Sequence, residues 1–301
     1  VEYRILAHAN NGATGYQGTV YQRADTGEIV VAHRGTEFKE QFFLDALTTD
    51  GSMLVNRTNP QAQDAIELTK QAPAFARSSE ERTVRTLHVT LTGHSLGGAL
   101  AQISAHHFGL GGETFNAYGA ASLGYRIPEG GRAMVNHVIA TDPVSAASPH
   151  YGEVRVYAQP DDINRLQRGG FSNSRVNMLM EDYPLVVAGA SFGAHKMHNF
   201  LNVGADGRPD RSVLEDPQAR QRAVDNARMI DEYRDDLNER RAAVSVGARL
   251  RDPLGTAKDA IDIIRGPLDP GAPAQQEAPR NGQDHSSLRI DDPRHGGNTL
   301  F

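Results

Sequence analysis

The chain has 301 residues, 39% of them hydrophobic, and a net charge of −6 without basic clusters. These values fit one large domain with an additional segment, and they argue against nucleic acid as a partner. No apolar run is long enough to span a bilayer, no secretory signal pattern opens the chain, and the lack of cysteine excludes disulfides and thiolate metal sites, so we expect no metal and no cofactor.

The first predicted elements are a hairpin and a helix. Residues 18–23 and 28–34 are β-rich and are joined by Asp25-Thr26-Gly27, which suits a tight reversal. Asn59 and Pro60 form a helix start signal, because Asn is a good N-cap and Pro fits the first helical position. The residues that recur at helical spacing after it, as far as about residue 76, include Ala62, Ala65, Ile66 and Thr69.

The most informative motif is Gly93-His94-Ser95-Leu96-Gly97, between the apolar run 87–91 and the helix-like stretch 98–110. This context predicts a serine nucleophile on a sharp strand-to-helix turn, where small residues on both sides let the backbones pack closely. The N–H of Leu96 is then expected to face a developing oxyanion. The alternative is a chance match in a glycine-rich chain.

Three further apolar runs, at residues 114–117, 134–140 and 153–158, end at Gly, Asp or Pro. Strands that alternate with helices, after an initial hairpin, predict an α/β fold with a mostly parallel sheet.

A serine nucleophile needs a base and a carboxylate, which follow it in the order acid then histidine when the sheet is of the α/β-hydrolase type. Asp142 follows the predicted strand 134–140 and is our first candidate for the acid. Asp161 and Asp162, which close the next predicted strand in the same manner, are the alternative. His195 and His198 both lie in the right part of the chain for the base.

The second oxyanion donor is expected in the loop His33-Arg34-Gly35-Thr36, where Gly35 permits close approach and Thr36 offers an N–H and a hydroxyl. An ordinary turn at the end of a strand is the alternative.

Beyond residue 203 the chain becomes rich in charged residues. We predict a catalytic domain at 1–203, a charged helical extension or arm at 204–266, a flexible linker at 267–284 and a separate terminal segment at 285–301. One amphipathic helix is indicated by Val224, Ala227, Ile230, Tyr233 and Leu237, and a shorter one by residues 254–264.

Together, four motifs over residues 1–203 resemble the class 3 lipases, which are α/β-hydrolases acting on acylglycerols or phospholipids. The motifs are Val31-Ala32-His33-Arg34-Gly35-Thr36, Thr92-Gly93-His94-Ser95-Leu96-Gly97-Gly98, Thr114-Phe115-Asn116-Ala117 and Thr141-Asp142-Pro143-Val144-Ser145. The resemblance implies Ser95 as nucleophile, Asp142 as acid, and Thr36 with Leu96 as oxyanion donors. It prefers His195 over His198 as the base, because Phe200 and Leu201 follow His195 at the spacing of phospholipase A1-like members. The chain departs from that pattern in having Phe200 where Tyr is usual and His198 where an acidic residue often stands.

The family carries a lid or a substrate-facing helix between the positions of Thr36 and Leu54. The segment 37–47 has apolar side chains suited to an acyl chain or a membrane surface, and Phe42, Phe43 and Leu44 are the candidates for substrate binding. The same side chains are equally suited to the core.

The last residues, 287–301, resemble the opening of the C-terminal export module of antibacterial effectors delivered by bacterial type IV secretion. This resemblance implies a bacterial protein exported to the periplasm or envelope of a target cell, with an immunity protein and a secretion coupling protein as partners. A disordered polar tail is the alternative, and the protein is then expected in the cytoplasm.

The leading hypothesis is a serine acyl hydrolase that cleaves fatty-acyl esters of glycerophospholipids at a membrane surface, to which it binds peripherally. A carboxylesterase for soluble esters and a non-catalytic binding protein on a hydrolase fold are the alternatives.

Overall fold

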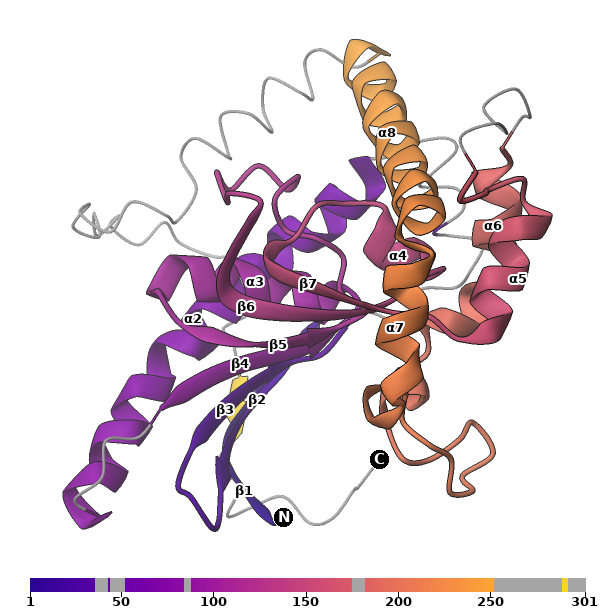
Figure 1. The fold of residues 1–301 in the computed structure, drawn as a ribbon. Helices are drawn as coiled ribbons and strands as arrows, with labels where there is room; N and C mark the ends of the chain where they lie inside the picture. The colour runs from indigo at the N-terminus through magenta and orange to yellow at the C-terminus, as the bar shows by residue number, and fades with distance from the viewer. Residues whose placement is uncertain (36–42, 44–51, 84–87, 175–181, 252–288, 292–301) are drawn as a thin grey trace.

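The computed structural model describes residues 1–35, 43, 52–83, 88–174, 182–251 and 289–291. Its strands form one sheet of eight in the order β7-β6-β5-β4-β3-β2-β1-β8 (Figure 1). The strands are β1 (Tyr3–Asn11), β2 (Tyr16–Arg23), β3 (Ile29–His33), β4 (Val89–His94), β5 (Gly111–Phe115), β6 (Gly130–Ile139), β7 (Tyr151–Tyr157) and β8 (Arg289–Asp291).

Five strands, β3 to β7, run parallel, and β1, β2 and β8 pair antiparallel at one side of the sheet. The predicted hairpin is confirmed as β2 and β3, which pair from Gly18 opposite His33 to Gln22 opposite Ile29. Parallel neighbours need a crossover segment, and α3 supplies the one between β4 and β5. This order of strands and helices confirms the expected α/β-hydrolase fold with a C-terminal helical arm.

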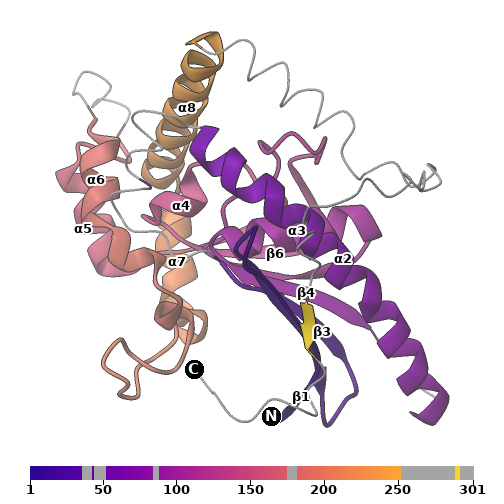
Figure 2. The same cartoon turned by 180° about the vertical axis from the view of Figure 1, so that it is seen from behind.

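Helices cover both faces of the sheet. The main core lies under α2 and α3, which pack against each other and on the same side of the sheet (Figure 2). A second, smaller cluster, which includes Ile139, Tyr157 and Phe200, covers the opposite face near the strand ends. The helices are α2 (Ser52–Thr83), α3 (Leu96–Phe108), α4 (Pro143–Ala146), α5 (Pro160–Arg168), α6 (Pro184–Ala190), α7 (Pro217–Asp225) and α8 (Ala227–Arg251), with 3-10 turns η2 (Phe192–His195), η3 (Met197–Phe200) and η4 (Val213–Glu215).

The predicted start of the first long helix was wrong. Helix α2 begins at Ser52 and continues through Pro60. Pro60 is exposed, so the hydrogen bond lost at its nitrogen falls on the side of the helix that water can reach. The residues predicted to face inward, Ala62, Ala65, Ile66 and Thr69, are buried as expected.

The predicted amphipathic helix is broken into α7 and α8. Asn226 ends α7, and its side chain donates from Nδ2 to the carbonyl oxygen of Arg222 at 2.8 Å. Val224 therefore lies on a different helix from the rest of the stripe and is 67% exposed, while Ile230, Tyr233 and Leu237 are buried in the main core. The predicted helix 254–264 and linker 267–284 fall outside the described residues, and the assigned domain bounds stay a prediction.

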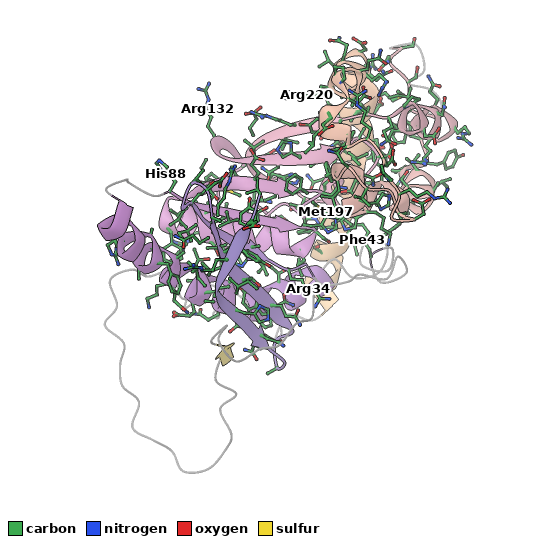
Figure 3. The ribbon with its side chains drawn as sticks, turned by 90° about the horizontal axis from the view of Figure 1, so that it is seen from below. Arg34, Phe43, His88, Arg132, Met197 and Arg220 are labelled. Atoms are coloured by element: carbon green, nitrogen blue, oxygen red, sulfur yellow. The ribbon has the colours of Figure 1, made fainter. Side chains whose placement is uncertain are left out.

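The strand ends place the candidate residues at one edge of the sheet. Ser95 follows β4, Asn116 follows β5 and Asp142 follows β6, so all three leave the carboxyl ends of adjacent parallel strands. Figure 3 shows Arg34, Phe43 and Met197 toward this end of the sheet, with His88 and Arg132 toward the other. Within the described residues, no helix combines the length and apolar character that crossing a membrane would require.

Because three histidines are buried, we expect the folded protein to lose stability in mild acid. Burial lowers the pKa of His33 to about 3 and those of His94 and His150 to about 4. The unfolded chain takes up protons on these imidazoles below pH 6.5, whereas the folded chain does not until near pH 4. The free energy of unfolding should therefore fall as pH drops through this window, by about 2 kcal/mol per histidine at pH 5. Urea unfolding between pH 7.5 and 5 measures the effect, and an unchanged free energy across that range would contradict it.

Candidate active site

Ser95 occupies the sharp turn between β4 and α3. Its backbone has φ 58° and ψ −128°, a left-handed φ that a residue with a side chain rarely adopts. Two main-chain contacts secure the turn, since Gly98 N–H and Tyr118 N–H both donate to the Ser95 carbonyl at 3.1 Å. Such strain at one residue is typical of a functional position that its surroundings hold in place. The turn points the Ser95 hydroxyl toward the segment that carries His195.

Close backbone approach explains the two glycines of the motif. A Cβ on Gly93 would lie 2.3 Å from the carbonyl oxygen of Gly97. A Cβ on Gly97 would lie 2.2 Å from the carbonyl oxygen of His33, on the neighbouring strand. Both distances are far below any van der Waals contact, so only glycine fits at either position.

Ser95, His195 and Asp142 form one chain of hydrogen bonds. His195 Nε2 lies 2.9 Å from Ser95 Oγ, and His195 Nδ1 lies 2.9 Å from Asp142 Oδ1. The Asp142 carboxylate accepts the Nδ1 proton, which leaves Nε2 free to accept the proton of the Ser95 hydroxyl. The Ser95 residue is 3% exposed, and the side chain of His195 is 12% exposed. The imidazole thus borders the surface while the carboxylate beneath it is buried.

The Asp142 carboxylate is stabilised as an anion inside the protein. Burial alone would raise its pKa, but the neighbouring His195 and hydrogen bonds from Ser145 outweigh that effect and lower the pKa. Asp142 is also the N-cap of α4, and its two oxygens accept from Val144 N–H at 3.2 Å and Ser145 N–H at 3.0 Å. Because these donors fix both oxygens, the carboxylate has one orientation toward His195.

Two side chains hold the main chain at His195. His94 donates from Nε2 to the carbonyl oxygen of His195 at 2.7 Å, and the two imidazole rings lie 4.7 Å apart. Asn116 donates to the carbonyl oxygen of Ala194 at 2.7 Å and accepts from Ile139 N–H at 2.9 Å. Asn116 therefore ties the ends of β5 and β6 to the histidine segment.

The surroundings of Ser95 fit an oxyanion site. Leu96 begins α3, where the first N–H groups of a helix have no partner within the helix. Gly35, which follows β3, lies against the turn, and a Cβ there would be 2.5 Å from the carbonyl oxygen of His94 and 3.2 Å from Ser95 Cβ. The loop predicted to carry the second donor thus reaches Ser95, although Thr36 itself lies outside the described residues.

The alternatives for base and acid lie elsewhere. His198 is on the next turn, η3, whereas His195 makes the hydrogen bonds to Ser95 and Asp142. Asp161 and Asp162 were expected to close a strand, and this was wrong. They lie in the first turn of α5, where Asp162 accepts from Gln159 N–H as part of a capping box.

Of the three candidate substrate-binding residues, the structure describes Phe43. Phe42 and Leu44 lie outside the described residues. Phe43 is fully buried and packs edge to face against Phe192, with ring centroids 5.9 Å apart. Phe192 begins η2, the turn that ends at His195. Phe43 therefore packs on the histidine segment, and its direct contact with substrate stays a prediction.

Sequence patterns did not reveal the residues that hold Ser95, His195 and Asp142 in place. His94 bonds to the His195 carbonyl and so joins two segments far apart in the chain. Ser145 and Asn116 stood in recognised motifs without a role. Tyr233 and Arg234, which reach the segment of Asp142, carried no signal beyond the helical spacing of Tyr233.

Residues 5–135 match the family model of a Tle-like phospholipase domain, described as phospholipase-like. The match includes most of β1, all of β2 to β5, the turn at Ser95 and the start of β6, and it ends before Asp142 and His195. A comparison with curated protein sequences finds no match.

Among solved structures, the chain is similar to several lipases. The lipase of Rhizomucor miehei in its native propeptide complex shares 18% identity over 53% of this chain and 58% of that chain, with a TM-score of 0.36. The Lip2 lipase of Yarrowia lipolytica shares 14% identity over 52% of this chain and 66% of that chain, with a TM-score of 0.35. The chain thus spans less than two thirds of either lipase. The family model therefore matches residues 5–135, the part of the chain that resembles Tle-like phospholipase domains.

Proposed function

We propose that this protein is a serine acyl hydrolase that cleaves fatty-acyl esters of glycerophospholipids. The observation that carries the proposal is the hydrogen-bonded chain of Ser95, His195 and Asp142 on a strained strand-to-helix turn. The substrate class is supported by the match of residues 5–135 to a phospholipase-like family.

In the first half of the proposed reaction, Ser95 Oγ attacks the ester carbonyl while His195 Nε2 accepts the hydroxyl proton. The Asp142 carboxylate holds the imidazole in the required tautomer and stabilises its positive charge. The N–H of Leu96, with Thr36 as the second donor, stabilises the oxyanion. Collapse of the tetrahedral intermediate breaks the ester bond, and His195 returns the proton to the departing alcohol, a lysophospholipid.

In the second half, water attacks the acyl-serine. His195 Nε2 takes a proton from that water as the oxygen bonds to the carbonyl carbon, and the oxyanion is stabilised as before. The intermediate releases the free fatty acid, and the proton on His195 returns to Ser95 Oγ. Protons balance over the two halves, and His195 acts as base and then acid in each.

We further propose that the enzyme acts on a membrane surface without crossing it and that it is an exported antibacterial effector with a cognate immunity protein. The export proposal rests on the resemblance of residues 287–301, of which only β8 is described. Loss of competitive killing by a strain that carries Ser95→Ala, with secretion of the protein retained, would support it. If the Ser95→Ala strain kills competitors as well as the strain with the unchanged protein, the proposal is contradicted.

Mass spectrometry of the products from a mixed bacterial lipid extract tests the proposed activity. Free fatty acids and lysophospholipids should appear with the unchanged protein and be absent with Ser95→Ala. Turnover limited to short-chain soluble esters would instead identify a carboxylesterase. An absence of turnover with every ester would favour a binding protein on a hydrolase fold.

A further inference from the structure

Helix α8 contacts the segment that carries the Asp142 carboxylate. We call residues 141–147 the acid loop, since they include Asp142 and α4. Three side chains of α8 donate to main-chain carbonyl oxygens of this loop: Tyr233 Oη to Thr141 at 3.1 Å, Arg234 Nη2 to Ser145 at 2.9 Å, and Arg241 Nε to Ala147 at 2.9 Å. One helix therefore binds the acid loop at its start, its middle and its end.

Arg234 is the contact nearest to the carboxylate. Its guanidinium donates from Nη2 to the carbonyl oxygen of Ser145 and from Nη1 to Ser145 Oγ at 3.3 Å. The N–H of the same Ser145 donates to Asp142 Oδ2. Ser145 thus links Arg234 on α8 to the carboxylate that orients His195.

The spacing along α8 explains how it presents these donors. Arg234 and Arg241 are seven residues apart, which is about two helical turns, so both lie on one face. Tyr233 and Leu237 beside them are fully buried and anchor that face in the main core. The donors therefore come from a helix whose position is fixed by packing.

The guanidinium of Arg234 bonds to Ser145 rather than to a carboxylate. In the part of the chain that the structure describes, no carboxylate forms an ion pair with it, and its bonds go to Ser145. Burial lowers the pKa of Arg234, and the nearby Asp142 carboxylate is the largest of the effects that oppose this shift. Arg234 is half-buried, and a cation that loses part of its hydration needs well-placed partners, so its position beside the acid loop requires an explanation.

We propose that α8 is a positioning element for Asp142, with Arg234 as its central residue. This inference rests on the proposed function of Ser95, His195 and Asp142. Arg234 holds Ser145, Ser145 holds Asp142 Oδ2, and the other carboxylate oxygen is then kept in line with His195 Nδ1. The helical arm is thus coupled to the active site through the acid loop.

Arg234→Met should separate this role from simple packing. Arg234 also lines an open cavity of about 870 Å³, so methionine can be accommodated there without a clash. We expect kcat for a soluble ester to fall about 10- to 100-fold, because small displacements of catalytic groups have effects of that size. KM should stay within about twofold, since no substrate contact is lost. Arg234→Lys, which keeps the charge and a donor, should recover most of the rate.

Arg222→Met is the matched control. Arg222 also lies on the arm and donates from Nη1 to a main-chain carbonyl, that of Ala158, and it pairs with Asp216. It does not contact the acid loop, so its loss should lower stability while kcat stays near that of the unchanged protein. Equal effects of the two substitutions on kcat would overturn the positioning role.

A second measurement does not depend on turnover. In the full chain with labelled histidine, the proton that His195 Nδ1 shares with Asp142 can be followed by NMR. Its resonance should shift or broaden in Arg234→Met, recover in Arg234→Lys and stay unchanged in Arg222→Met. An unchanged resonance in Arg234→Met would overturn the inference even if the enzyme is active. If the resonance shifts in Arg234→Met but the unchanged protein hydrolyses no ester, the positioning of Asp142 is supported and only the proposed function is refuted.

Discussion

Replacing Ser95 by alanine is expected to reduce phospholipid hydrolysis by about 10⁴- to 10⁶-fold, the range seen when a triad nucleophile is removed. The hydroxyl lies 2.9 Å from His195 Nε2 and is the only group of residue 95 that the substitution deletes. The fold should be retained, because the turn is held by the two N–H groups that donate to the carbonyl of residue 95. Initial rates on mixed phospholipid vesicles, with thermal unfolding of both proteins, measure the two effects.

Ser104→Ala is the control for this substitution. Ser104 is fully buried in α3, the helix that Ser95 precedes, and its hydroxyl has no hydrogen-bond partner among the described residues. Its removal deletes the same atom from the same region and should leave the rate nearly unchanged. Full activity of Ser95→Ala, or an equal loss in Ser104→Ala, would contradict the assignment of Ser95 as nucleophile.

Asp142→Asn should lower kcat by about 10⁴-fold, with KM little changed. An asparagine side chain presents an amide where the carboxylate accepted the Nδ1 proton, so the imidazole no longer has Nε2 free as a base. The amide oxygen can still accept from Ser145 N–H, but the amide nitrogen replaces the oxygen that accepted from Val144 N–H, so α4 keeps one of its two cap bonds. Steady-state kinetics on a soluble ester separate the loss of rate from any loss of binding.

Asp162→Asn is the matched control, because Asp162 is the other buried acid that the sequence offered for this role. Burial raises the pKa of Asp162, whereas that of Asp142 is lowered, and Asp162 bonds to Thr141 and to Gln159 N–H rather than to a histidine. Its substitution should affect stability and change kcat only a few-fold. If Asp162→Asn were the inactive protein and Asp142→Asn the active one, the acid would be misassigned.

The sequence predicted the parts of the site that depend on local spacing and on chain order. The spacing Gly93, Ser95, Gly97 predicts a close-packed turn, and the distances from Gly93 and Gly97 explain both glycines. Asp142 was expected at the end of a strand because the acid must leave the carboxyl edge of the sheet beside the nucleophile. It lies there, three residues after the end of β6.

Other features depend on contacts that no local pattern records. His195 and His198 are three residues apart and chain order suits both equally, while the resemblance favours His195. The path of the chain through η2 and η3 places His195 beside Ser95. Asp162 was misread because a Pro-Asp-Asp run suits both a strand end and a helix start. The bond from Arg234 to Ser145 joins residues 89 positions apart, and a charged helix gives no sign of such a partner.

The central claim is that Ser95 is an activated nucleophile, and covalent labelling tests it most directly. A fluorophosphonate reacts with a serine whose proton a neighbouring base can accept, and it needs no knowledge of the natural substrate. We expect one adduct per chain, located on Ser95 by peptide mass spectrometry, with labelling abolished by unfolding and strongly slowed in His195→Ala. Folded protein that remains unlabelled at Ser95, or that labels equally fast without His195, would contradict the account.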